Sequence, residues 1–210
     1  MTDHESPDRR PDPDAGEARG AGGGEGGGRR PGVEPLYAAE TIAREVAALG
    51  ARLDRELPAD VLIVSLVSGS AIFLADLVRS IPRPVRYELL HVEMGLGSPE
   101  AGGDEGSLLT LHYPVDFSVR GESLLLLKDV VASGVIETYL LGQLREHGAR
   151  EARIAALVDK AEDRKTDLEV DYRVFSDSGP GILVGYGLKH RGGHGNLPYI
   201  GTLAEGESVV

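Results

Sequence analysis

The chain has 210 residues, a formal net charge of −12 at pH 7 and no cysteine. An acidic protein repels polyphosphate backbones at long range, so its composition argues against nucleic acid as a partner. The absence of cysteine excludes disulfides, thiolate metal sites and a cysteine nucleophile, and it is compatible with a reducing compartment. No apolar run approaches the roughly 18 to 20 residues of a membrane span. We therefore expect a soluble cytoplasmic protein that has no membrane partner.

Residues 1–34 consist mainly of glycine, proline and charged side chains. Apart from Met1, the first thirty residues carry no large apolar side chain. Such a segment has nothing to bury against the entropy cost of ordering it. The sequence predicts a disordered tail over residues 1–34 and a single folded domain over residues 35–210.

Helical and strand-like patterns alternate after the tail. Between residues 37 and 57, apolar side chains recur at three- and four-residue steps, which indicates an amphipathic helix. The run VLIVSL at residues 61–66 is typical of a strand buried on both faces, and a helix is expected over residues 71–79. Further strands are expected at residues 85–92, 123–131, 153–158, 170–175 and 182–187, with a helix over residues 137–147. This order predicts an α/β fold with a parallel sheet.

Polar, charged or glycine residues directly follow expected apolar strands at four places in the sequence. Ligands of open α/β sheets bind at the carboxyl ends of the strands, so these places are candidates for a site. They are Ser68-Gly69-Ser70, residues 128–136, Asp159-Lys160 and residues 189–199.

The same four places carry a resemblance to a known family. The first block reads VLIVSLVSGSAIFLADLVRSIPRPV and the second LLLLKDVVASGVIETYLLGQL. The third reads IAALVDKAEDRKTDLEVDY and the fourth VGYGLKHRGGHGNLPYIGTL. Together, in this order and spacing, they resemble the hypoxanthine-guanine branch of the type I phosphoribosyltransferases.

The resemblance implies a Rossmann-like parallel-sheet fold with a small hood region. It also implies transfer of phosphoribosyl from phosphoribosyl pyrophosphate (PRPP) to a 6-oxopurine, with Mg²⁺ carrying the polyphosphate charge. PRPP, a purine base and a nucleoside monophosphate would then be the ligands. Relatives of this family associate, so we also expect a homodimer or another homo-oligomer.

The PRPP-binding block departs from the family pattern at two of its three acidic positions. The resemblance places Lys128 where the family has the first acid, and Asp129 keeps the second. Ala132 stands at the position of the proton-handling carboxylate, so the family's general base is missing. Asp129 is the catalytic candidate that remains, and we assign no metal ligands.

The phosphate loop is only partly kept. Ser133 and Gly134 precede a helix, whose N-terminus can hold a monophosphate, but Ile136 replaces the family's hydroxyl residue. A phosphate cup and a simple helix cap are about equally compatible with these residues.

The pyrophosphate side also departs from the family. Ser68 replaces a lysine before Gly69, Lys189 replaces an acid, and Gly195 replaces an arginine. Arg191 lies nearby in the sequence, although arginine positions are not interchangeable in bidentate phosphate binding. The lid that closes over the family's site aligns with Glu93-Met94 and the acidic, glycine-rich segment after it.

The residues expected to contact the purine base depart less from the family pattern than the phosphate-binding positions do. By resemblance, Lys160 donates to the 6-oxo group of the purine, while Ile182, in the place of a stacking aromatic, and Leu183 provide apolar contact. His190 and His194 have no evident third metal ligand, and we expect two exposed imidazoles.

Three functions are compatible with this pattern. The first is ordinary synthesis of a nucleoside monophosphate, which the substitutions disfavour. The second is a phosphoribosyltransferase with altered chemistry, on a purine or an unusual base, in which Lys128 and Lys189 supply charge in place of a metal. The third is a non-catalytic relative that binds a nucleotide or a partner.

Overall fold

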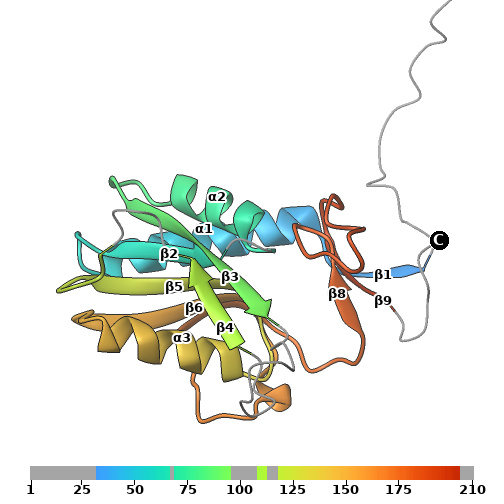
Figure 1. Cartoon of the computed structure of the whole chain (residues 1–210). Helices are drawn as coiled ribbons and strands as arrows, with labels where there is room; N and C mark the ends of the chain where they lie inside the picture. Colours follow the sequence, from blue (N-terminus) through green and yellow to red (C-terminus); the bar gives the residue numbers. More distant parts are fainter. Residues whose placement is uncertain (1–31, 67–68, 96–107, 113–117, 204–210) are drawn as a thin grey trace, which may run out of the picture.

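A computed structural model describes residues 32–66, 69–95, 108–112 and 118–203, with only the backbone described for residues 91–95 and 108–112. Three α-helices, one short 3₁₀ helix and two sheets make up the described part (Figure 1). No helix in these ranges is long and apolar enough to cross a membrane.

The larger sheet has six strands, five of which run parallel to one another. In spatial order they are β4 (Leu108–His112), β3 (Arg86–Gly95), β2 (Leu62–Leu66), β5 (Ser123–Val131), β6 (Glu151–Asp159) and β7 (Tyr172–Ser176). Only β4 is antiparallel to its neighbour. The expected parallel α/β sheet is confirmed, and β4 was not predicted.

Helices cover both faces of this sheet, as Figure 1 shows. On one face α1 (Ala39–Glu56) and α2 (Ala71–Ser80) pack on Leu125 and Leu127 of β5. On the other face α3 (Val135–Glu146) packs on Leu124 and Leu126. Successive side chains of a strand point to opposite faces, so an unbroken apolar run is what a sheet covered on both sides requires. Fully burying each leucine contributes about 1.5–3 kcal/mol.

The smaller sheet lies beside the first and is antiparallel. Its strand order is β1 (Val33–Tyr37), β9 (Ile200–Leu203) and β8 (Ile182–Val184). The strand expected at residues 182–187 therefore ends earlier and joins this sheet. The chain turns at Gly185, whose φ is 94°, and a side chain there would collide with the carbonyl of Tyr199. This sheet corresponds to the expected hood region, while β1 and β9 were not predicted.

The first strand changes where the described fold begins. Val33 is 3% exposed, and its register partner in β9 is Leu203. The expected tail boundary at residue 34 therefore falls inside β1. Residues 1–31 lie outside the described part.

The remaining expectations are met with shifted ends. The helix α3 begins at Val135, before the expected residue 137, because Gly134 in a left-handed conformation (φ 76°) ends the preceding turn. A short 3₁₀ helix, η2 (Ala161–Asp163), follows β6. The glycine-rich segment 96–107 lies outside the described residues.

Candidate active site

Three of the four sequence blocks meet at the carboxyl ends of β2 and β5. The carboxylate of Asp129 lies against Gly69, where any side chain would overlap Oδ2. Gly187, after β8, approaches the same turn, since a Cβ there would lie 2.5 Å from the Gly69 carbonyl. Its φ of 94° also favours glycine. Glycine at both positions allows the first, second and fourth blocks to come together.

Lys128 and Asp129 form an ion pair with each other. Lys128 Nζ lies 2.5 Å from Asp129 Oδ1, and the two side chains are 17% and 13% exposed. The same oxygen accepts a hydrogen bond from the backbone N–H of Val130 at 2.9 Å. One carboxylate oxygen at the expected PRPP position is therefore already bound by an ammonium group. Ala132, which follows, offers no side-chain proton acceptor.

The described residues do not fit the Mg²⁺ that the resemblance implies. Mg²⁺ prefers oxygen ligands, commonly one or two carboxylates with substrate oxygens. Here Asp129 is paired with Lys128, and within the described residues no group of three or more His, Cys, Asp or Glu side chains could hold a metal ion. An ammonium this close to the carboxylate opposes a divalent cation.

The phosphate loop is supported by residues that the sequence alone did not point to. A Cβ at Gly134 would lie 2.7 Å from Thr166 Oγ1 and 2.8 Å from Arg164 Cδ. Arg164 is ion-paired with the buried Asp159, and its Nη1 is buried without a hydrogen-bond partner in the described part. The loop after η2 thus places a guanidinium beside the start of α3.

Ser133 and Ile136 take ordinary roles in this loop. Ser133 Oγ accepts a long, 3.4 Å hydrogen bond from the N–H of Val135, and its carbonyl accepts from Lys165 N at 2.9 Å. Ile136, in place of the family's hydroxyl, is partly buried against the α3-side core.

Lys160 is nearly buried and already has partners. Its residue is 9% exposed, and Nζ donates to the carbonyl of Gly179 at 2.9 Å. Asp177 Oδ2 lies 3.4 Å from the same ammonium and Asp163 Oδ2 lies 3.8 Å from it. No pattern in the sequence pointed to Asp177, which lies in the loop between β7 and β8.

The two apolar residues expected beside the base differ in burial. Ile182 is 37% exposed, while Leu183 is 8% exposed and belongs to the core that α1 and α2 cover. Ile182 is thus available to a ligand, whereas Leu183 packs inside.

The loop between β8 and β9 carries the remaining candidates. Arg191 is exposed and has a positive φ of 48°, and Lys189 is exposed beside Gly195. Both ring nitrogens of His194 are buried and have no hydrogen bond within the described residues. The expectation of two exposed imidazoles is therefore wrong, because His190 and His194 are both only partly exposed.

A hydrogen bond from Tyr186 connects this loop to the larger-sheet part of the fold. Its hydroxyl donates to Asp76 Oδ2 of α2 at 2.6 Å. Burial, and then the hydrogen bond to Asp76, raises the pKa of Tyr186 well above its ordinary value of 10.0. The phenol stays protonated and keeps the C-terminal block in place.

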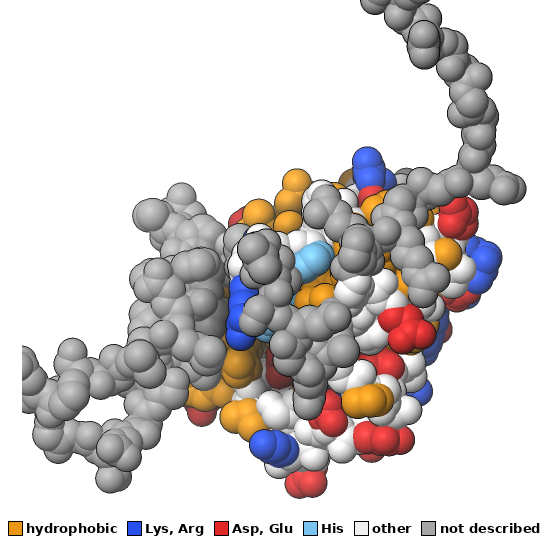
Figure 2. Space-filling view, turned by 90° about the vertical axis from the view of Figure 1, so that its right-hand side faces the viewer, with side chains coloured by type: hydrophobic (Ala, Val, Ile, Leu, Met, Phe, Trp, Pro, Cys, Tyr) orange, Lys and Arg blue, Asp and Glu red, His pale blue; other side chains and the backbone are white. Residues whose placement is uncertain are grey.

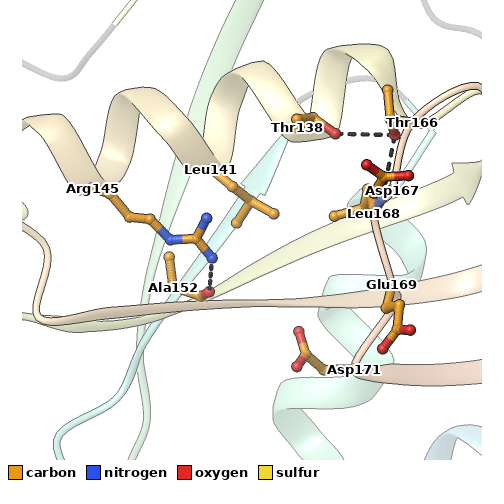
Figure 3. Close-up of a pocket in the computed structure, with 9 residues that line it drawn as sticks. All are labelled: Thr138, Leu141, Arg145, Ala152, Thr166, Asp167, Leu168, Glu169 and Asp171. Atoms are coloured by element: carbon orange, nitrogen blue, oxygen red, sulfur yellow. Dashed lines mark hydrogen bonds between the residues drawn. The ribbon is translucent and has the colours of Figure 1, made fainter.

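An open groove of about 540 Å³ lies apart from these residues, between α3 and the loop before β7 (Figure 3). Arg145 donates to the carbonyl of Ala152 there, and Thr138 bonds to Thr166 at the other end. Acidic side chains of the loop line its rim, and none of the sequence candidates does. On the side of the smaller sheet, Figure 2 shows acidic, basic and apolar side chains interspersed rather than one basic surface among those coloured.

Three of the candidate residues lie wholly or partly outside the described part of the chain. Ser68 is not described, and the side chains of Glu93 and Met94 are not described, although both residues pair through the β3–β4 ladder. The lid segment after them is also outside the described residues.

Comparison with known proteins assigns the class. The model of the phosphoribosyl transferase domain matches residues 32–191, so the chain belongs to the phosphoribosyltransferase family. Its fold is the type I fold, with a five-strand parallel sheet and a small antiparallel sheet.

Within the family, the chain is similar to hypoxanthine-guanine enzymes. It is 31% identical over 169 residues to the hypoxanthine-guanine phosphoribosyltransferase of Bacillus subtilis, covering 80% of this chain and 91% of the relative. It is 31% identical over 175 residues to that of Mycobacterium tuberculosis, covering 80% and 84%. A hypoxanthine phosphoribosyltransferase structure from Staphylococcus aureus superposes with a TM-score of 0.72 at 27% identity, covering 81% and 91%.

Proposed function

We propose that this phosphoribosyltransferase-family protein binds a purine nucleotide and that the family's Mg²⁺-dependent turnover is lost or altered in it. The observation that carries the proposal is the Lys128–Asp129 ion pair, 2.5 Å long, at the PRPP-binding position. A lysine that neutralises the remaining acid supplies the positive charge that a metal would bring. We also propose that the protein is cytoplasmic, as expected for a protein of purine salvage.

The base side supports continued nucleotide binding. Lys160 is held at the end of β6, and an ammonium there donates to a 6-oxo group and disfavours a 6-amino group. On the opposite side of the ribose, Ser133, Gly134 and the nearby Arg164 guanidinium offer N–H donors and positive charge to a monophosphate.

The chemistry of a turnover step is what the substitutions weaken. With Ala132 in place of the family's carboxylate, no side chain at that position accepts the proton that leaves the purine nitrogen. Lys128 and Lys189 remain as fixed cations that could stabilise a leaving polyphosphate.

The test is a calorimetric titration of the full chain with GMP, IMP and PRPP, each in the presence of excess Mg²⁺ and again with a chelator. We expect binding of GMP or IMP that is nearly independent of the metal, and very low synthesis of either nucleotide from PRPP and base. No binding of any of the three ligands would overturn the proposal. Efficient Mg²⁺-dependent synthesis would overturn its second half.

A second candidate is an active phosphoribosyltransferase that acts on a purine or an unusual base without metal. The two lysines, Lys128 and Lys189, favour it, because they place ammonium groups where the family has acids. Pyrophosphate release from PRPP in the presence of a chelator and a mixture of bases separates it from a non-catalytic nucleotide or partner binder.

We also propose that the protein is a homo-oligomer, most simply a dimer. Tyr87 and Leu89 are 50% and 43% exposed at alternate positions of β3, so both project from one face of the sheet. Burying such side chains against a second copy would stabilise a two-fold pair. Light scattering at micromolar concentration tests this, and a mass near 22.3 kDa would contradict it.

A further inference from the structure

The outward side of α3 carries two neighbouring apolar side chains. Val135 and Tyr139 are 50% and 42% exposed and lie four residues apart, so they adjoin on one side of the helix. Thr138, between them in the chain, lines the groove beside α3. Single exposed apolar residues are common on protein surfaces, but adjoining ones beside a groove with a polar rim are typical of an interaction site.

Gly142 lies on the same side of α3, in the interior of the helix. A Cβ at this position would meet nothing within 4 Å among the described residues. The fold itself therefore gives no steric reason for glycine there, although glycine inside a helix is less favourable than alanine. A missing side chain does allow the backbone of another segment to approach closely. We refer to Val135, Tyr139, Gly142 and the adjacent groove as the α3 surface.

The groove has an apolar floor and an acidic rim, as Figure 3 shows. Leu141, which is 3% exposed, points into it from α3, and the acids come from the loop before β7. Asp167 and Glu169 are exposed and form no hydrogen bond or ion pair within the described residues. Asp171 Oδ2 accepts a 2.8 Å hydrogen bond from the N–H of Ile154.

The rim is negative overall. Among the residues that line the groove, Arg145 is the one basic side chain, and its Nη2 donates to the carbonyl of Ala152 at 3.1 Å. Asp167 and Glu169 therefore have no cation beside them within the described residues, and they are available to a partner.

The charge of the α3 surface restricts what can bind to it. Free carboxylates repel the phosphates of nucleic acids and of anionic lipids, and a second copy of this chain itself carries a net charge of −12. They attract lysine and arginine side chains, and complementary charge gives an interface its specificity. The exposed Val135 and Tyr139 in turn require a partner with apolar side chains on one face. A basic amphipathic helix meets all of these conditions.

We propose that the α3 surface binds a basic amphipathic helix of a partner protein. The apolar face of that helix packs on Val135 and Tyr139 and passes closely over Gly142, while its lysine or arginine side chains pair with Asp167 and Glu169. None of the candidate active-site residues lines the groove, so this binding is independent of the proposed nucleotide binding.

The probe is a displayed library of random peptides of about 18 residues, roughly five turns of helix, selected for binding to the full chain. We expect the enriched peptides to carry lysine or arginine together with apolar residues at three- and four-residue steps. Fluorescence anisotropy then measures the affinity of one enriched, labelled peptide for the protein and its variants. A selection that yields no peptides of this pattern would overturn the proposal.

Two variants locate the binding on the α3 surface. Glu169→Lys should weaken the peptide by at least about tenfold, because like charges then face each other. Gly142→Gln should weaken it by a similar factor, because the new side chain fills the space that the partner needs. Glutamine is a good helix former and position 142 is open, so the melting temperature should not fall. Unchanged affinity in both variants would show that the peptide binds elsewhere.

Glu40→Lys is the matched control. It makes the same charge change as Glu169→Lys at an exposed residue in the first turn of α1, which packs on the opposite face of the larger sheet. We expect its peptide affinity to stay within about twofold of the unmodified protein, because charges this far apart are largely screened. A loss as large as that of Glu169→Lys would mean that the net charge of the protein alone attracts the peptide, and the proposal would be wrong.

Discussion

The side chain of Lys189 lies over Gly195, so that a Cβ at position 195 would lie only 2.6 Å from Lys189 Cγ. The resemblance places an acid and an arginine at these two positions. A side chain at position 195 would overlap Lys189, so the glycine at 195 leaves the space that the lysine at 189 occupies. The lysine provides a positive charge in the region that loses the arginine.

This contact predicts a non-additive effect on stability. Gly195→Ala should lower the free energy of unfolding by about 1–3 kcal/mol, as overpacking does, and by much less when Lys189→Ala removes the obstructing Cγ. Denaturant unfolding of the two single variants and the double variant measures the coupling. Gly193→Ala serves as control, because its Cβ would meet nothing nearer than 3.7 Å. Additive losses would show that Lys189 does not occupy the space at 195.

The effect of removing the N-terminal segment on stability should depend on whether Val33 is kept. Deleting residues 1–31 should leave the melting temperature unchanged, since residues 2–30 hold no large apolar side chain. Deleting residues 1–34 also removes Val33, which is 3% exposed and pairs with Leu203. Thermal melts of both truncations test this. Equal melting temperatures would mean that the β1–β9 pairing at Val33 adds no stability.

The sequence predicted the larger sheet because its strands are buried on both faces. The runs at residues 62–66 and 123–131 are almost wholly apolar, a pattern that few other structures produce. The smaller sheet was missed because Val33–Tyr37 is short, contains Pro35 and forms a strand only by pairing with β9, far away in sequence.

The candidate site, like the fold, could be predicted from the sequence only in part. Residues that directly follow a strand, such as Lys160, are positioned by the sheet and could be located from the apolar pattern. Asp177 and Arg164 could not, because loop conformation brings them to Lys160 and Gly134. The Lys128–Asp129 pair was visible only as two adjacent charges, since neighbours on a strand ordinarily point to opposite faces.

Tyr186 should make stability depend on alkaline pH. Burial and the Asp76 hydrogen bond raise its pKa in the folded state above 10.0, so the unfolded chain loses the phenolic proton first. Stability is therefore complete below pH ~10 and falls as pH rises further, because the folded state then binds more protons. Tyr186→Phe should make this fall shallower, measured by denaturant unfolding at several pH values. Tyr139→Phe, at a tyrosine that is 42% exposed, should leave the fall unchanged.

Lys160 should contribute directly to base binding. Lys160→Ala should weaken IMP or GMP binding by about 1–3 kcal/mol, the usual value for a lost charged hydrogen bond. Lys165→Ala removes an exposed lysine from the following loop and should have little effect. Calorimetric titration of the two variants makes the comparison. Unchanged affinity in Lys160→Ala would remove Lys160 from the site.

The metal requirement should respond to restored acids. Lys128→Glu combined with Ala132→Asp returns two carboxylates to the PRPP block and releases Asp129 from its ion pair. Because Mg²⁺ binds where carboxylates are not opposed by a nearby ammonium, the double variant should gain Mg²⁺-dependent nucleotide binding. Any GMP or IMP synthesis that it gains would mean that the scaffold has kept the means to align base and PRPP.

The control for that experiment is Lys165→Glu, which repeats the lysine-to-glutamate change of position 128 at an exposed position. It should bind nucleotides with the metal dependence of the unmodified protein, measured by titration with Mg²⁺ and with a chelator. Efficient synthesis of IMP or GMP by the unmodified protein, abolished by the chelator, would show that the Lys128–Asp129 pair opens to admit the metal. The ion pair would then be a resting arrangement, and the substitution at Lys128 would leave the family's reaction intact.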